Sequence, residues 1–243
     1  MCLLVFALRA HPRYRFVFAG NRDELHTRAT EAAGWWPDAD SVLGGRDLEA
    51  GGTWLAVTRG GRFGVVANVR ESAGNGHQKR SRGELVADYV RGRESPAEFG
   101  AVLQSTGLQY AGFSLVLGDQ AELYYFSNRD RNRSSLPPGV HGIDNERLNA
   151  PGPRLARARQ GFEALLVAED LHADSLFDLL ADRTPARERE ASSFLVGPAF
   201  GTRSSSVILI DRAGELGFFE RRFGPQGELL GSSAFAFPIG GAG

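Results

Sequence analysis

The sequence is poor in cysteine and has no long apolar run, and each shortage excludes a class of protein. Cys2 is its one cysteine, so neither an internal disulfide nor a cysteine-rich zinc site can form. No window approaches the roughly 20 apolar residues of a membrane-spanning helix. The apolar run 3–8 is too short for the core of a signal peptide. We therefore expect a cytoplasmic protein with no integral membrane segment.

The chain also lacks an excess of charge of one sign. Lys+Arg is 28 and Asp+Glu is 29, which gives a net charge of -1. Proteins that bind nucleic acid usually carry a basic excess, so we expect no nucleic-acid partner. Hydrophobic residues make up 42% and charged residues 23%, the balance of a soluble globular protein. Lys79 is the one lysine among the basic residues, which we attribute to genomic bias.

Apolar runs separated by turn residues predict four β-hairpins along the chain. The expected strand pairs are 2–9 with 14–19, 53–58 with 62–69, 111–117 with 121–127, and 204–211 with 215–221. Four helices are expected near 81–92, 95–107, 151–167 and 171–181. Residues 21–52 are expected to be irregular, because double glycines interrupt them. Hairpins and paired helices without β–α–β alternation predict a single α+β domain over 1–243, with helices outside two stacked sheets.

Cys2 is the residue best suited to chemistry. A small residue after Met1 permits removal of Met1, which leaves a cysteine with both a thiol and a free α-amine. The amine has a pKa of about 7.7–8, so it can act as a base near neutral pH. Cysteine is the most nucleophilic side chain in that range. The alternative is a cysteine that is simply buried in the first strand.

The polar segment 21–24 follows directly on the second predicted strand. It reads Asn21, Arg22, Asp23 and Glu24. In an antiparallel hairpin the end of the second strand lies beside the start of the first, so this segment should neighbour Cys2. Arginine there would lower the pKa of the thiol, and a carboxylate would hold the amine or a substrate group. The alternative is a solvated turn with an internal salt bridge.

Four further residues each have a structural and a functional interpretation. Asn68 and Asn145 are either turn formers or amide donors to a developing oxyanion. Arg203 is either a surface charge or an anchor for an anionic substrate group. Trp54 belongs to the core or to the wall of a substrate pocket. The five histidines have no metal-binding spacing, so we expect no metal.

Taken together, the motifs resemble the NRDE family of transport and Golgi organisation proteins. The matching stretches are MCLLVFA at the start, AGNRDE at 19–24, GGRDLEAGGTWLAV at 44–57, ANVRE at 67–71, SRGELV at 81–86 and GTRSSSVILID at 201–211. They follow one another in order over nearly the whole chain.

That family is similar in turn to cysteine N-terminal-nucleophile (Ntn) hydrolases, and the resemblance implies their αββα fold. It implies Cys2 as the nucleophile, a site built with 21–24, Asn68 as oxyanion donor and Asn145 as a second asparagine. The hydrolases place arginine three residues before aspartate, whereas Arg22 and Asp23 are adjacent here. The carboxylate that assists Cys2 is therefore either Asp23 or Glu24.

Two functions follow from the resemblance. The first is an amidohydrolase that acts on a small linear amide and needs no cofactor. The second is a non-catalytic protein on the same scaffold that binds haem or an acyl compound, in line with the haem trafficking and lipid or acyl-CoA homeostasis linked to eukaryotic members. Both imply a small-molecule partner.

Overall fold

The computed structural model describes residues 2–69, 79–129, 133–168, 170–183 and 192–240. The chain divides into two compact units. The first consists of Met1–Thr27, Pro137–Asp144 and Leu148–Pro238, and the second of Arg28–Leu136, Asn145–Arg147 and Ile239–Gly243. The sequence also predicts a fraying tail at 238–243 and a mobile loop at 70–80. Part of that tail and most of that loop lie outside the described residues. The single domain stays a prediction.

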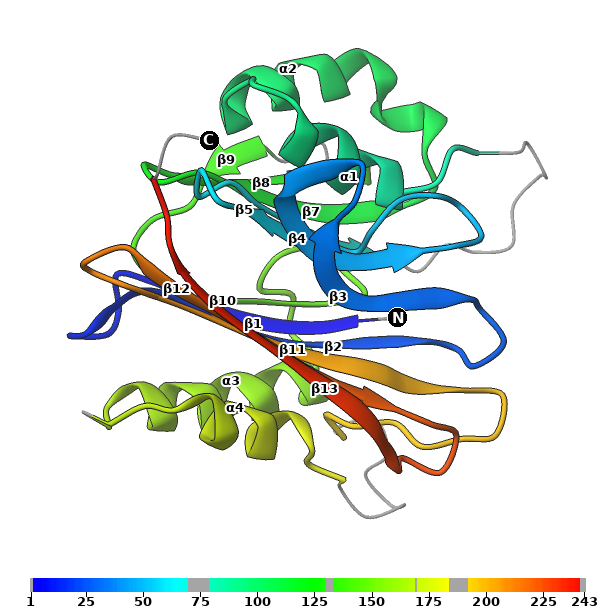
Figure 1. The fold of residues 1–243 in the computed structure, drawn as a ribbon, viewed down its shortest axis with the longest axis vertical. Coiled ribbons are helices and arrows are strands. Elements are labelled where there is room, and N and C mark those ends of the chain that lie inside the picture. Colours follow the sequence, from blue (N-terminus) through cyan, green and yellow to red (C-terminus); the bar gives the residue numbers. More distant parts are fainter. Residues whose placement is uncertain (1, 70–78, 130–132, 169, 184–191, 241–243) are drawn as a thin grey trace. The chain divides into compact units, whose positions relative to one another are not determined.

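The first unit contains a six-stranded antiparallel sheet in the order β10-β1-β2-β11-β12-β13 (Figure 1). Its strands are β1 (Cys2–Leu8), β2 (Tyr14–Leu25), β10 (Gly139–Asp144), β11 (Phe200–Asp211), β12 (Glu215–Phe223) and β13 (Leu229–Pro238). The helices α3 (Pro153–Leu166) and α4 (Ala173–Leu180) pack on one face of this sheet.

Strand alternation explains why the helices cover that face. Leu3, Val5, Val17, Ala19 and Val207 point to the same side of the sheet, because successive side chains of a strand alternate. They share a buried core with Leu155, Phe162, Leu176 and Leu180 of the two helices. We call this side the helix-covered face, and the other side the Cys2 face.

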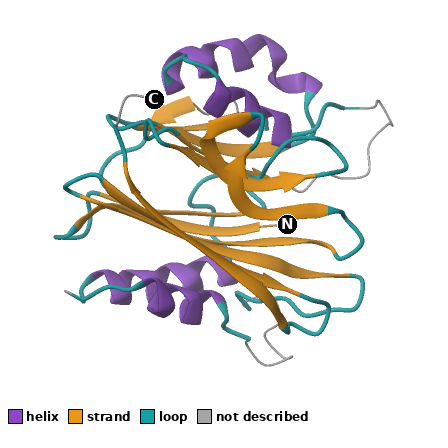
Figure 2. Cartoon of the chain, viewed as in Figure 1, coloured by secondary structure: helices purple, strands orange, loops and turns teal. Residues whose placement is uncertain are grey.

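The second unit contains a seven-stranded antiparallel sheet in the order β3-β4-β5-β6-β7-β8-β9. Its strands are β3 (Thr30–Trp36), β4 (Ala39–Asp47), β5 (Leu55–Thr58), β6 (Phe63–Asn68), β7 (Phe113–Gly118), β8 (Leu123–Ser127) and β9 (Arg133–Ser135). The helices α1 (Gly83–Arg91) and α2 (Pro96–Thr106) pack on it, and a 3₁₀ turn, η1, follows at Gly107–Gln109. Figure 2 shows each helix pair on the sheet of its own unit.

The α+β class, the antiparallel sheets and the four predicted hairpins are confirmed. The prediction that 21–52 is irregular is wrong, because this region contains the end of β2 and the whole of β3 and β4. Strands β9, β10 and β13 were not predicted. Among the residues that the structure describes, no helix is long and apolar enough to cross a membrane.

Candidate active site

Cys2 is the first residue of β1 and pairs directly with Arg22 of β2. The predicted proximity of Cys2 to the segment 21–24 is therefore met through strand register. Burial raises the pKa of the Cys2 thiol, and the neighbouring Asp23 and Glu24 raise it further, whereas Arg22 lowers it. A thiol with a raised pKa is protonated at neutral pH, so it needs a nearby base to become a nucleophile.

The segment 21–24 is divided between the two faces of the sheet. It lies inside β2, so the turn interpretation is wrong. Arg22 pairs with Cys2 and shares its face, as does Glu24 two residues further on. Asn21 pairs with Leu3 and, like Asp23, points to the helix-covered face. The four residues thus belong to two different environments.

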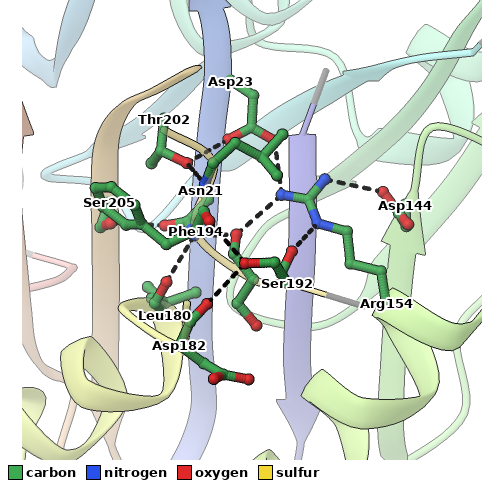
Figure 3. A network of polar contacts seen from close by, with 12 residues as sticks. Asn21, Asp23, Asp144, Arg154, Leu180, Asp182, Ser192, Phe194, Thr202 and Ser205 are labelled. Carbon is green, nitrogen blue, oxygen red and sulfur yellow. Dashed lines mark hydrogen bonds and ion pairs between the residues drawn. The ribbon is translucent and has the colours of Figure 1, made fainter. Parts of the chain in front are cut away.

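Asp23 is held by two partners on the helix-covered face (Figure 3). Its Oδ2 accepts a hydrogen bond from Arg154 Nη2 at 2.7 Å, and its Oδ1 accepts one from the hydroxyl of Thr202 at 2.7 Å. All three residues are buried. Such charge-assisted bonds fix the position of a carboxylate.

Arg154 links Asp23 to the surrounding backbone. It comes from α3 and also donates to Asp144 Oδ1 at 3.2 Å and to the carbonyls of Ser192 and Ser193, both at 2.9 Å. Burial lowers the pKa of Arg154, but the charges of Asp23 and Asp144 outweigh it and leave that pKa raised. The guanidinium is therefore permanently charged, and it bonds to the carboxyl groups of both Asp23 and Asp144.

The antiparallel register also locates the backbone nitrogen of Cys2. Leu3 pairs with Asn21, and Cys2 pairs with Arg22. Because the strands are antiparallel, a step from Cys2 toward the N-terminus runs alongside the step from Arg22 to Asp23. The nitrogen of Cys2 lies on that side of its own Cα. In a chain without Met1, that nitrogen would be a free amine on the Asp23 side of Cys2.

Asn21 ties α4 and a neighbouring loop segment to the sheet. Its Nδ2 donates to the carbonyls of Leu180 at 2.9 Å and Ser193 at 2.8 Å, and its Oδ1 accepts from the Ser205 hydroxyl at 2.6 Å. Both amide hydrogens are thus engaged with backbone oxygens. This geometry suits a residue that positions the helix-covered face, and a catalytic role for Asn21 stays a prediction.

A β-bulge at Arg203 adjoins this cluster. Thr202 pairs with Asp23 and Ser204 with Arg22, so Arg203 is an extra residue opposite two consecutive residues of β2. Its Nη1 donates to the carbonyl of Leu25 at 2.8 Å. Burial lowers the pKa of Arg203, while Glu24 raises it. Bulges of this kind often lie next to active sites, where they redirect a side chain.

Three predicted site residues belong to the second unit. Asn68 is the last residue of β6 and pairs with Phe113. The ring of Trp54 lies against Gly45, where an added Cβ would come within 2.4 Å of it. Asn145 is buried and has a φ of 53°, the left-handed conformation that asparagine tolerates. Their approach to Cys2 stays a prediction.

Sequence reasoning missed the two partners of Asp23, Arg154 and Thr202, and it missed Asp144, the second carboxylate bonded to Arg154. Arg154 lies in the motif Pro153–Arg154–Leu155, where it reads as one of several helical arginines. Thr202 lies within the matched stretch 201–211, two residues before Ser204, but nothing in that stretch marks it as a partner of Asp23. No group of three His, Cys, Asp or Glu residues with metal-binding geometry occurs in the described part of the chain.

The two antiparallel sheets with their four helices have the fold of a solved amidase structure. The structure of the N-acylethanolamine-hydrolyzing acid amidase ortholog from Caenorhabditis elegans aligns with a TM-score of 0.54. The alignment covers 86% of this chain and 92% of that protein, at 11% sequence identity. The predicted fold is therefore confirmed.

The chain belongs to the Transport and Golgi organisation 2 family, whose model matches residues 1–225. The Transport and Golgi organization protein 2 homolog of Bos taurus is 32% identical, over 91% of this chain and 92% of the bovine one. The human homolog is 28% identical over the same shares of the two chains. The Drosophila melanogaster protein is 29% identical, over 94% of this chain and 95% of its own.

Proposed function

We propose that this protein is a cysteine amidohydrolase of the Ntn type, which acts on a small linear amide after Met1 has been removed. The observation that carries the proposal is the register of β1 and β2. It sets the Cys2 thiol beside Arg22 and directs the Cys2 nitrogen toward Asp23, which Arg154 and Thr202 hold in place. The Ntn fold and the name of its structural neighbour, an amidase, agree with this reaction class.

In the proposed reaction the α-amine of Cys2 takes the proton of its own thiol. The sulfur attacks the amide carbonyl, a carbon–sulfur bond forms, and the negative charge moves to the carbonyl oxygen. Following the resemblance, we assign that oxygen to the side-chain amide of Asn68 and to backbone N–H groups. The ammonium then protonates the leaving nitrogen as the carbon–nitrogen bond breaks. Water hydrolyses the thioester that remains and restores the thiol.

The structure adds a reason why the base must be close at hand. Burial raises the pKa of the thiol, so the thiolate is scarce at neutral pH without assistance. The amine of the same residue is the nearest base available to a processed chain. Asp23 stabilises the ammonium form that this amine takes after accepting the proton, while Arg22 on the Cys2 face stabilises the thiolate.

The proposal is tested by N-terminal mass spectrometry and by labelling with an electrophilic amide, iodoacetamide. Mass spectrometry should find Cys2 as the first residue. Labelling of Cys2 should rise with pH through one ionisation, and Cys2→Ser should abolish it. A variant with lysine inserted between Met1 and Cys2 retains its first residues and blocks the amine. It should label far more slowly, although its thiol is intact.

Two results would overturn the proposal. One is retention of Met1 in the protein as isolated from its own cells. The other is equal labelling of the lysine-insertion variant and the processed chain, because the amine would then not be the base. Turnover is measured separately, as amine released from a panel of N-acyl amines, with Cys2→Ser as the blank.

A further inference from the structure

Four side chains form a line across the Cys2 face of the six-stranded sheet. Cys2 on β1 pairs with Arg22 on β2, Arg22 pairs with Ser204 on β11, and Ser204 pairs with Arg222 on β12. Directly opposed residues in antiparallel strands share a face, so all four lie on one side of the sheet. We call Cys2, Arg22, Ser204 and Arg222 the Cys2 row.

Two atoms of the Cys2 row lack a hydrogen-bond partner among the residues that the structure describes. They are the hydroxyl oxygen of Ser204 and the Nε of Arg222, and both atoms are buried. Ser204 as a residue is 4% exposed. Buried polar atoms are nearly always hydrogen-bonded, and leaving one unpaired costs about 1–3 kcal/mol. Two such atoms on directly opposed residues indicate a missing partner that both can share.

The chemistry of the two atoms defines that partner. Arginine Nε can only donate a hydrogen bond, and a serine hydroxyl can also donate. Glu220 is the charge partner of Arg222, but its Oε1 lies 4.0 Å from the Nε, beyond hydrogen-bond range. A shared partner must therefore present an acceptor oxygen. Arg22 has its own charge partner, Glu24, at 3.9 Å, so the preference for an anionic oxygen comes from the unfilled donor of Arg222.

Strand β13 leaves room for the Arg222 side chain. Gly231 pairs with Arg222, and a Cβ added at Gly231 would lie 2.4 Å from Arg222 Nη2. The guanidinium thus extends over the backbone of Gly231, and any larger residue there would displace it. This packing keeps Arg222 on the Cys2 face at a fixed place in the row.

We propose that Ser204 and Arg222 bind an anionic oxygen group of the substrate, a carboxylate, phosphate or sulfonate. This inference rests on the proposed role of Cys2 as nucleophile and names the substrate class: a linear amide with an anionic group remote from its carbonyl. Neighbouring strands are about 4.8 Å apart, so Ser204 and Arg222 lie roughly 10–14 Å from Cys2 along the row. The anionic group should be separated from the scissile carbonyl by that span.

A set of chloroacetamides of increasing length tests the span. Each probe carries a terminal carboxylate, and its matched control carries the neutral N-methyl amide instead. Alkylation of Cys2 forms a carbon–sulfur bond and releases chloride, and the thiol proton passes to the base. For each length, the labelling rate of the acid is divided by that of its neutral control. This ratio should be largest for the probe whose carboxylate reaches about 10–14 Å from Cys2. At that length we expect an advantage of about ten-fold, the size of a charge-assisted hydrogen bond.

Matched variants assign the peak to named residues. Arg222→Gln and Ser204→Ala should each flatten the dependence of the acid-to-neutral rate ratio on probe length. Arg221→Gln is the control, because Arg221 adjoins Arg222 but points to the helix-covered face and pairs with Asp174 at 2.6 Å. Arg221→Gln should keep the peak. The subsite is overturned if the acid-to-neutral rate ratio of the wild type does not depend on probe length. It is also overturned if Arg221→Gln loses as much of the peak as Arg222→Gln.

Unreactive N-acetyl analogues of the same acids separate this inference from the proposed function. Their binding, followed by titration calorimetry, does not need a nucleophilic Cys2. Binding of the long acid that Arg222→Gln weakens about ten-fold supports the subsite even if no probe labels Cys2. Absence of binding in the wild type overturns the subsite. Labelling by neutral probes without an acid advantage rejects the subsite and leaves the amidohydrolase proposal standing.

Discussion

At the scale of single residues, we expect Arg154 to act on Cys2 through Asp23. It neutralises part of the charge of Asp23, to which it is bonded at 2.7 Å. A negative charge near an amine favours the ammonium form and raises the amine's pKa, and a positive charge opposes this. In a chain that has lost Met1 as proposed, Arg154 should therefore keep the pKa of the Cys2 amine lower than Asp23 alone would allow.

Arg154→Gln should move the pH midpoint of Cys2 labelling upward by about one unit, because Asp23 would act on the amine without its counter-charge. Removal of one partner of a buried ion pair should also lower the free energy of unfolding by roughly 3–5 kcal/mol. Arg154→Lys keeps the charge and should restore the midpoint. The measurement is the labelling rate of processed protein as a function of pH, together with denaturant unfolding.

Two controls distinguish an electrostatic effect from general damage. Arg157→Gln, on the same helix, removes an exposed arginine that pairs with Asp182 at 2.7 Å, and should leave the midpoint unchanged. The double variant Asp23→Asn with Arg154→Gln removes both charges and should return the midpoint toward its original value. A midpoint that stays fixed in Arg154→Gln would show that the cluster does not act on the amine.

At the scale of strands and helices, local patterns predicted hairpins well and failed where backbones approach closely. Gly44 and Gly45 indicated an irregular region, yet both lie within β4. A Cβ at Gly44 would lie 2.5 Å from the carbonyl oxygen of Leu55 on β5, and one at Gly45 would meet Trp54. These glycines make close packing possible, and a single sequence does not distinguish this use of glycine from a turn.

The candidate site was predictable only in the part that one hairpin defines. Cys2 and 21–24 lie on adjacent strands of one hairpin, so the sequence alone was enough to predict that they are neighbours. Asp23 and Arg154 are separated by 131 residues, and no local pattern links positions so far apart. The division of 21–24 between two faces follows from alternation, but only once β2 is known to continue to Leu25.

Gly44→Ala tests the close-packing explanation. The added methyl group would overlap the β5 backbone, so we expect a loss of about 1–3 kcal/mol in the free energy of unfolding. Gly34→Ala is the matched control, since Gly34 pairs with Gly44 across β3 and β4. A Cβ at Gly34 would meet nothing closer than 4.0 Å, and alanine there should be neutral or slightly stabilising. Equal losses in the two variants would contradict this explanation.

At the scale of the whole molecule, the path of the chain couples the two units. It passes from one unit to the other after Thr27, Leu136, Asp144, Arg147 and Pro238. The core of the first unit joins strands from the N-terminal hairpin to helices and strands beyond residue 150. The first unit therefore cannot form before most of the chain is available.

We predict that the chain unfolds in one cooperative transition, as expected for a single domain over 1–243. Phe162→Ala truncates the core of the first unit and Leu115→Ala that of the second, and both side chains are fully buried. Each variant should lose about 2–5 kcal/mol. Each should lower the same Tm, by roughly 2–4 °C per kcal/mol for a chain of this length. Differential scanning calorimetry measures the shift and gives the calorimetric and van't Hoff enthalpies, which agree in a two-state transition.

The two variants together decide between one domain and two. If the units fold independently, Phe162→Ala lowers one transition and leaves a second at its original temperature, and Leu115→Ala does the reverse. If five chain crossings bind the units into one folding domain, both variants shift all of the heat absorption.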